Sequence, residues 1–171
     1  MRAVVAGRPQ ASGPADGCVD RTMPTYRTRV RTPWSAARAF DHLSDLEHFA
    51  EWDPGVERSV RVAGEGAAVG SAFDVTVAGI GPGPGLTLRY EIVASRSAER
   101  LEARAETWAL SSIDVITFAP TDDGGCVVTY DADLSLRGVL GLGNPVLGIV
   151  FGRIGDRAAA GLRRALDGVA A

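Results

Sequence analysis

Residues 86–136 contain four successive segments that decide the fold: LTLRYEIVA at 86–94, LEARAETW at 101–108, SIDVITF at 112–118 and CVVTYDADLSL at 126–136. Apolar and polar residues alternate in each segment, which is typical of strands with one buried face. The connections are short and rich in turn-forming residues, such as DDGG at 122–125. Because short connections join antiparallel neighbours, these segments predict an antiparallel meander.

The chain before this meander predicts three more strands and two short helices. The period changes to two from Val56, and alternation indicates strands near 26–30, 60–62 and 73–77. Thr32-Pro33 has the pattern of a helix cap followed by proline at the first helical position, and apolar residues at helical spacing continue to Leu43. A second short helix is expected at 46–51, before Pro54-Gly55.

The end of the chain predicts a long amphipathic helix. Apolar residues recur every three or four positions along one face, namely Val139, Leu142, Val146, Val150, Ile154, Ala158, Leu162 and Leu166. Asn144-Pro145 predicts a kink or restart near its beginning. Arginines beside the apolar stripe exclude a membrane-spanning helix.

Together these elements predict an α+β fold of the helix-grip type. A curved seven-stranded antiparallel sheet wraps around the long C-terminal helix, with two short helices after the first strand. One helix about 10 Å wide cannot fill the concave face of such a sheet. Since Ala103 and Ala105 point inward, we expect a cavity there, although bulky neighbours filling the space remain the alternative.

Length and composition indicate one domain, expected at 23–171. Residues 1–22 have no periodicity and are expected to be a disordered extension, and Met23 is an alternative start of translation. No secretory signal is visible, so the expected location is cytoplasmic. Two cysteines are too few for a disulfide framework.

The charge pattern excludes several classes of partner and chemistry. A net charge of −3 gives no basic field, so we expect neither nucleic-acid binding nor membrane insertion. All 18 basic residues are arginine, which rules out a lysine Schiff base. His42 and His48 have no further ligand at metal spacing, so no metal or cofactor is predicted.

The segment FDHLSDLEHFAEWDPGV at 40–56 resembles the signature of the polyketide cyclase/dehydrase group in the START/Bet v 1-like (SRPBCC) superfamily. Similar proteins have a helix, then Asp-φ-Glu-x-aromatic, then Trp-x-Pro-x-Val. The hairpin around GGCVV at 124–128 and the ending from Arg137 are also similar, so the resemblance covers about residues 25–168. It implies a pocket between sheet and helix, but not one chemistry, because the superfamily includes cyclases, lipid carriers, receptors and regulators.

Asp114 and Tyr90 are the candidate catalytic residues. Asp114 shares parity with Ile116, which is expected to face inward, and a buried carboxyl there would have a raised pKa and could act as acid or base. The alternative is a solvated carboxylate or one paired with an arginine. Periodicity also places Tyr90 inside, whereas the opposite register would bury an Arg89–Glu91 pair.

At one position of the strand at 86–94 the sequence differs from the aromatase/cyclases of this group. Aromatase/cyclases of this group resemble one another in carrying an inward arginine near the end of this strand, and the aligned position here is Val93. This counts against cyclase activity. The predicted ligand-binding residues are Phe49, Trp52, Phe73, Val75, Tyr90, Ala103, Ala105, Asp114, Ile116, Tyr130, Val146, Val150 and Ile154.

Three functions fit these residues. The first is binding of a hydrophobic small molecule such as a polyketide, lipid or aromatic compound. The second is a polyketide cyclase, aromatase or dehydratase in which Asp114 and Tyr90 handle protons. The third is a regulatory or chaperone-like protein without catalysis. In each case the chain is expected to be a monomer or a homodimer.

Overall fold

The computed structural model describes residues 25–78, 85–137 and 144–171. The elements follow in the order β1 (Thr25–Thr32), α1 (Ala36–Ser44), the 3₁₀ helix η1 (Leu46–His48), α2 (Phe49–Trp52), β2 (Val56–Ala63), β3 (Ala72–Val77), β4 (Leu86–Arg96), β5 (Arg100–Glu106), β6 (Leu110–Pro120), β7 (Cys126–Leu136), α3 (Asn144–Ala165) and β8 (Val169–Ala170). The predicted α+β helix-grip fold is confirmed.

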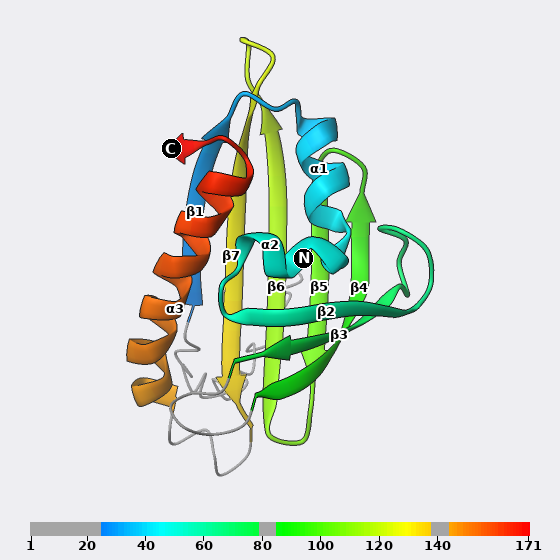
Figure 1. Cartoon of the computed structure of the whole chain (residues 1–171), viewed down its shortest axis with the longest axis vertical. Helices are drawn as coiled ribbons and strands as arrows, with labels where there is room; N and C mark the ends of the chain where they lie inside the picture. Colours follow the sequence, from blue (N-terminus) through cyan, green and yellow to red (C-terminus); the bar gives the residue numbers. More distant parts are fainter. Residues whose placement is uncertain (1–24, 79–84, 138–143) are drawn as a thin grey trace, which may run out of the picture.

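All strands join one antiparallel sheet in the order β2-β3-β4-β5-β6-β7-β1-β8. The sheet has eight strands rather than the predicted seven, because Val169–Ala170 pairs with Val30 and Arg31 on β1. A two-residue strand has too little pattern to be seen in sequence. Figure 1 shows β2 and β3 turning across the long strands, with all the helices on that same inner face.

Helix α1 begins later than the sequence pattern predicts. Ser35 is the cap, and its Oγ accepts a hydrogen bond from the Arg38 backbone N–H at 3.3 Å. Thr32 is still in β1, where its hydroxyl donates to the Leu166 carbonyl and accepts from the Trp34 N–H. Thr32 therefore ties the end of β1 to the end of α3 instead of capping α1.

Helix α3 lies against the sheet and α2 through glycines that permit close approach. A Cβ at Gly161 would lie 1.8 Å from the carbonyl oxygen of Trp52, and one at Gly155 would overlap the Tyr26 ring. The helix begins at Asn144, and the part predicted from Val139 to residue 143 lies outside the described residues. No helix in the described part of the chain is long and apolar enough to span a membrane.

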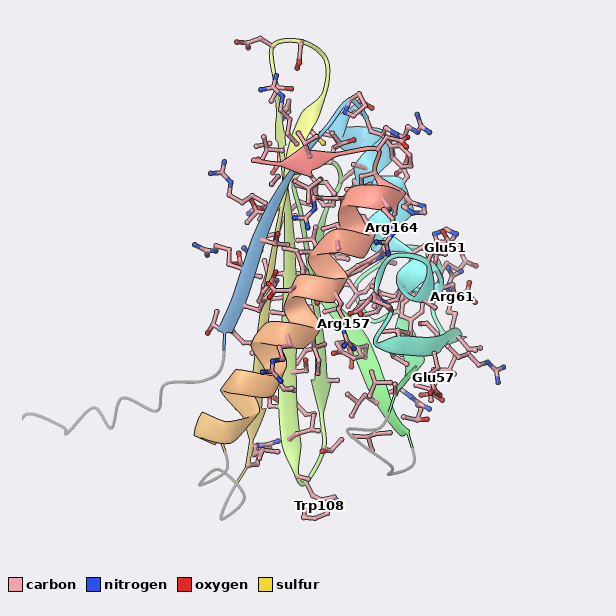
Figure 2. The ribbon with its side chains drawn as sticks, turned by 60° about the vertical axis from the view of Figure 1, so that its left-hand side comes forward. Glu51, Glu57, Arg61, Trp108, Arg157 and Arg164 are labelled. Atoms are coloured by element: carbon pink, nitrogen blue, oxygen red, sulfur yellow. The ribbon has the colours of Figure 1, made fainter. Side chains whose placement is uncertain are left out.

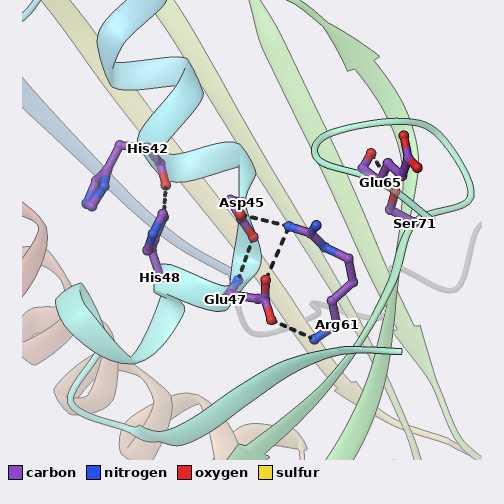
Figure 3. Close-up of polar contacts among 7 residues, drawn as sticks. All are labelled: His42, Asp45, Glu47, His48, Arg61, Glu65 and Ser71. Atoms are coloured by element: carbon purple, nitrogen blue, oxygen red, sulfur yellow. Dashed lines mark hydrogen bonds and ion pairs between the residues drawn. The ribbon is translucent and has the colours of Figure 1, made fainter. Parts of the chain in front are cut away.

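An ion cluster fixes the short helices to the edge of the sheet. The Nη2 of Arg61 on β2 lies 2.7 Å from Asp45 Oδ2 and 3.3 Å from Glu47 Oε2 (Figure 3). Asp45 also caps η1 by accepting from the Glu47 N–H. The helices that cover the interior are thereby held at both sides, by α3 and by β2.

Candidate functional site

Asp114 stands near the middle of β6, with a small residue on each side of it. Its cross-strand partners are Ala103 on β5 and Ala132 on β7, and all three side chains are buried. Because an alanine side chain ends at Cβ, neither of these neighbours can donate a hydrogen bond to the carboxyl. The strand register therefore places two small side chains beside Asp114 on the inner face.

The Asp114 carboxyl is buried, and only one of its two oxygens has a hydrogen-bond partner. Oδ1 accepts a hydrogen bond from the Tyr130 hydroxyl at 2.8 Å, whereas Oδ2 is buried without a hydrogen-bond partner. Burial raises the pKa of Asp114 to about 6, and the hydrogen bond from Tyr130 opposes that rise. Both protonation states are therefore within reach near neutral pH.

Tyr90 lies on β4 with its hydroxyl inside, as the periodicity predicts. The hydroxyl donates to Ser112 Oγ at 2.9 Å, and both side chains are buried. Burial, followed by the nearby Asp114 charge, raises the pKa of Tyr90 well above the usual phenol value. Tyr90 therefore stays protonated and serves as a hydrogen-bond donor.

Two aromatic residues of α2 cover this polar group. Phe49 and Trp52 are stacked, with ring centroids 4.6 Å apart. The Phe49 ring meets the Tyr90 ring edge to face at 6.1 Å, and the Trp52 ring meets the Tyr130 ring in the same way at 5.4 Å. Rings from α2, β4 and β7 thus form one aromatic wall beside Asp114.

Asp53 is a second buried carboxyl at the junction of α2 and β2. Its Oδ1 accepts a hydrogen bond from the Gly55 N–H at 2.7 Å. Burial raises the pKa of Asp53, and the bond from Gly55 opposes that rise. The Asp53 charge also contributes to the raised pKa of Asp114, so the two carboxyls share one electrostatic environment.

Ser112 and Asp53 are polar residues that the sequence interpretation missed. Ser112 has the same strand parity as Asp114, so periodicity alone could have placed it inside. Asp53 lies within the Trp-x-Pro segment and precedes a proline, which suggests a turn rather than a buried acid. Its burial follows from the packing of α3 against α2.

The alternative register of β4 is excluded. Arg89 points outward and forms an ion pair with Asp74, with Nε 2.6 Å from Oδ1. Val93, aligned with the inward arginine of similar proteins, is 37% exposed. The inward row of β4, Leu88, Tyr90 and Ile92, therefore carries no arginine.

The predicted ligand-binding residues come together as follows. The buried ones are Phe49, Trp52, Phe73, Val75, Tyr90, Ala103, Ala105, Asp114, Ile116 and Tyr130. Ile154 is half-buried, and the side chains of Val146 and Val150 lie outside the described residues. Trp108, by contrast, is 87% exposed at the turn between β5 and β6 (Figure 2).

The two histidines, on α1 and η1, are half-buried and lie against one another. Their rings stack with centroids 4.9 Å apart, and His48 Nδ1 lies 3.1 Å from the His42 carbonyl oxygen (Figure 3). Within 25–78, 85–137 and 144–171, no three His, Cys, Asp or Glu residues group as metal ligands.

Comparison with known proteins places this arrangement in a family. The family model described as "Polyketide cyclase / dehydrase and lipid transport" matches residues 23–167. The chain belongs to this family. A comparison with curated protein sequences found no match.

Solved structures of the polyketide cyclase/dehydrase and START type are similar in fold. An aromatase/cyclase, Zhui, from Streptomyces sp. R1128 aligns with a TM-score of 0.68 at 14% identity, covering 85% of this chain and 94% of that one. A START superfamily protein from Mycobacterium smegmatis aligns with a TM-score of 0.67 at 13% identity, covering 84% and 97%. At such identities the likeness shows the fold alone.

Proposed function

We propose that the chain binds a hydrophobic small molecule between the inner face of the sheet and α3. The observation that carries the proposal is the buried Oδ2 of Asp114, which lacks a partner among small and aromatic side chains. A buried polar atom without a partner is costly, and a ligand atom would satisfy it. Membership of a cyclase and lipid transport family supports the same function.

Titration with a neutral polyaromatic probe, N-phenyl-1-naphthylamine, tests the binding function. We expect saturable fluorescence enhancement with a Kd on the order of micromolar or lower. Ala103→Leu, which adds bulk beside Asp114, should weaken binding at least about tenfold. The matched control is Ala119→Leu, at an exposed position on β6. Absence of saturable binding to the unmodified protein would refute the proposal.

A second candidate is cyclisation or dehydration of a poly-β-ketone in the same interior. The pKa of Asp114, raised to about 6, favours it, because the group can give a proton to a carbonyl oxygen or take one from the carbon between two carbonyls. Tyr90 would donate a hydrogen bond to the developing oxyanion after turning its hydroxyl away from Ser112 Oγ. If Asp114→Asn retained full turnover of such a substrate, Asp114 would have no part in the reaction.

The location, the domain bounds and the oligomeric state of the protein are also part of this proposal. We propose a cytoplasmic protein in which residues 23–171 form the ligand-binding domain and 1–22 an extension. Size-exclusion chromatography with light scattering would separate monomer from homodimer. Neither state alters the binding test, because the site residues named above lie within one chain.

A further inference from the structure

The ionisable side chains buried in the described part of the protein are all acidic. Within the described residues, Asp53 and Asp114 are buried, while no arginine or histidine is buried. The sequence from 138 to 152, which includes the first nine residues of α3, contains no ionisable residue. Within the described residues, therefore, no buried base neutralises the two acids.

Asp114 Oδ2 has no hydrogen-bond partner, although the Tyr90 hydroxyl lies near enough to lower the pKa of Asp114. Oδ1 accepts a hydrogen bond from the Tyr130 hydroxyl, and the Tyr90 hydroxyl donates to Ser112 Oγ. The flanking side chains, Ala103 and Ala132, offer no donor. A ligand that donates a hydrogen bond would satisfy this oxygen.

The surrounding rings favour positive charge as well. Phe49, Trp52, Tyr90 and Tyr130 contact one another in a continuous series from α2 to β4 and β7. Aromatic faces attract cations, most strongly where water is excluded. An apolar body with a cationic end would therefore match both the rings and the carboxyl.

We propose that this interior selects hydrophobic ligands by the charge of their polar end, taking a protonated amine whose N–H donates to Asp114 Oδ2 and rejecting a carboxylate. The inference rests on the proposed binding function and narrows its ligand class. An anionic ligand would place a third negative charge beside two buried acids, with no base to offset it.

The pH dependence of this selectivity depends on the ionisable groups whose charges or hydrogen bonds act on Asp114. They are Tyr90 from β4, Tyr130 and Asp133 from β7, and Asp53 from the α2–β2 junction. None of them is a base that could replace the amine. Because Asp114 has a pKa of about 6, its carboxylate prevails at pH 7.5 and its neutral form at pH 5.

Three probes of similar shape separate charge from size: 2-naphthylmethylamine, 2-naphthylmethanol and 2-naphthoate. By calorimetry at pH 7.5 we expect the amine to bind about tenfold tighter than the alcohol, and the carboxylate about tenfold weaker. Asp114→Asn should reduce the gap between amine and alcohol to about twofold or less. Asp41→Asn removes the same charge from an exposed position on α1 and should leave the order unchanged.

Repeating the titrations at pH 5 tests the role of the Asp114 charge in the unmodified protein, without a substitution. The preference of the unmodified protein for the amine over the alcohol should shrink as Asp114 gains its proton. If 2-naphthoate binds as tightly as the amine at pH 7.5, or if Asp114→Asn keeps the full amine preference, the charge selectivity is refuted while binding stands. If none of the three probes binds saturably while N-phenyl-1-naphthylamine does, the charge selectivity is refuted; if N-phenyl-1-naphthylamine fails as well, the binding function itself is overturned.

Discussion

Replacing Asp114 with asparagine should stabilise the ligand-free protein at neutral pH, although the carboxyl is buried and hydrogen-bonded. Burial raises the pKa of this group from 3.8 to about 6. At 1.36 kcal/mol per pKa unit, holding the ionised form in the fold costs about 3 kcal/mol above pH 7. Asparagine keeps an oxygen for the Tyr130 hydroxyl and removes the charge.

The amide also introduces N–H groups at the position of Oδ2, which has no partner. An unsatisfied buried donor costs about 1–3 kcal/mol, so the expected net gain for Asp114→Asn is about 0–2 kcal/mol at pH 7.5. For a chain of this length each kcal/mol corresponds to about 2–4 °C in Tm.

The pH dependence gives the sharper test. Because the fold raises the pKa of Asp114, the native state holds a proton between about pH 4 and pH 6 that the unfolded state releases. The free energy of unfolding of the unmodified protein should therefore fall as pH rises through that window. Asn cannot titrate, so the advantage of Asp114→Asn should be present at pH 7.5 and absent at pH 4.

Urea denaturation followed by circular dichroism at pH 4, 5, 6 and 7.5 measures this difference. Asp41→Asn, on the exposed side of α1, controls for the general effect of removing a carboxylate. If the difference in the free energy of unfolding between the Asp114→Asn and unmodified proteins stays constant from pH 4 to 7.5, the burial of Asp114 does not raise its pKa, and the reasoning is refuted.

Three further substitutions test the packing and the polar group. Gly161→Ala would place a Cβ 1.8 Å from the Trp52 carbonyl oxygen and should lower stability by about 1–3 kcal/mol, whereas Gly152→Ala, which meets nothing within 4 Å, should raise it by up to about 1 kcal/mol. Calorimetric Tm values check both, and equal effects would contradict the close contact of α3 with α2. Tyr130→Phe removes the donor to Asp114 Oδ1 and should raise the pKa of Asp114 above about 6, measured by carboxyl ¹³C NMR; an unchanged midpoint would exclude that bond.

The side chains on the inner face of the sheet could be predicted because residues two positions apart on a strand point to the same face. Side chains on a strand alternate with a period of two, so Ile116 and Phe118 fix the direction of Asp114 two residues away. The same rule places Tyr90 inside and Arg89 outside. These predictions needed only the pattern within one strand.

Features that depend on contacts between distant segments could not be predicted in this way. Thr32 has a capping pattern, but the Leu166 carbonyl at the far end of the chain binds its hydroxyl and Ser35 caps α1 instead. Asp53 is buried because α2 packs beneath α3, a contact that no local period encodes. Likewise, the alanines beside Asp114 are known to flank it only from the strand register.

The hydrogen-bond state of the interior separates the two candidate ligand classes. A ketone offers only acceptors, and the Tyr130 and Tyr90 hydroxyl protons are already directed to Asp114 and Ser112. A ketone ligand therefore needs the protonated form of Asp114 and should bind more tightly below pH 6. A protonated amine needs the carboxylate and should bind more tightly above pH 6. The direction in which affinity changes across that pH thus reports whether Asp114 meets an acceptor or a donor.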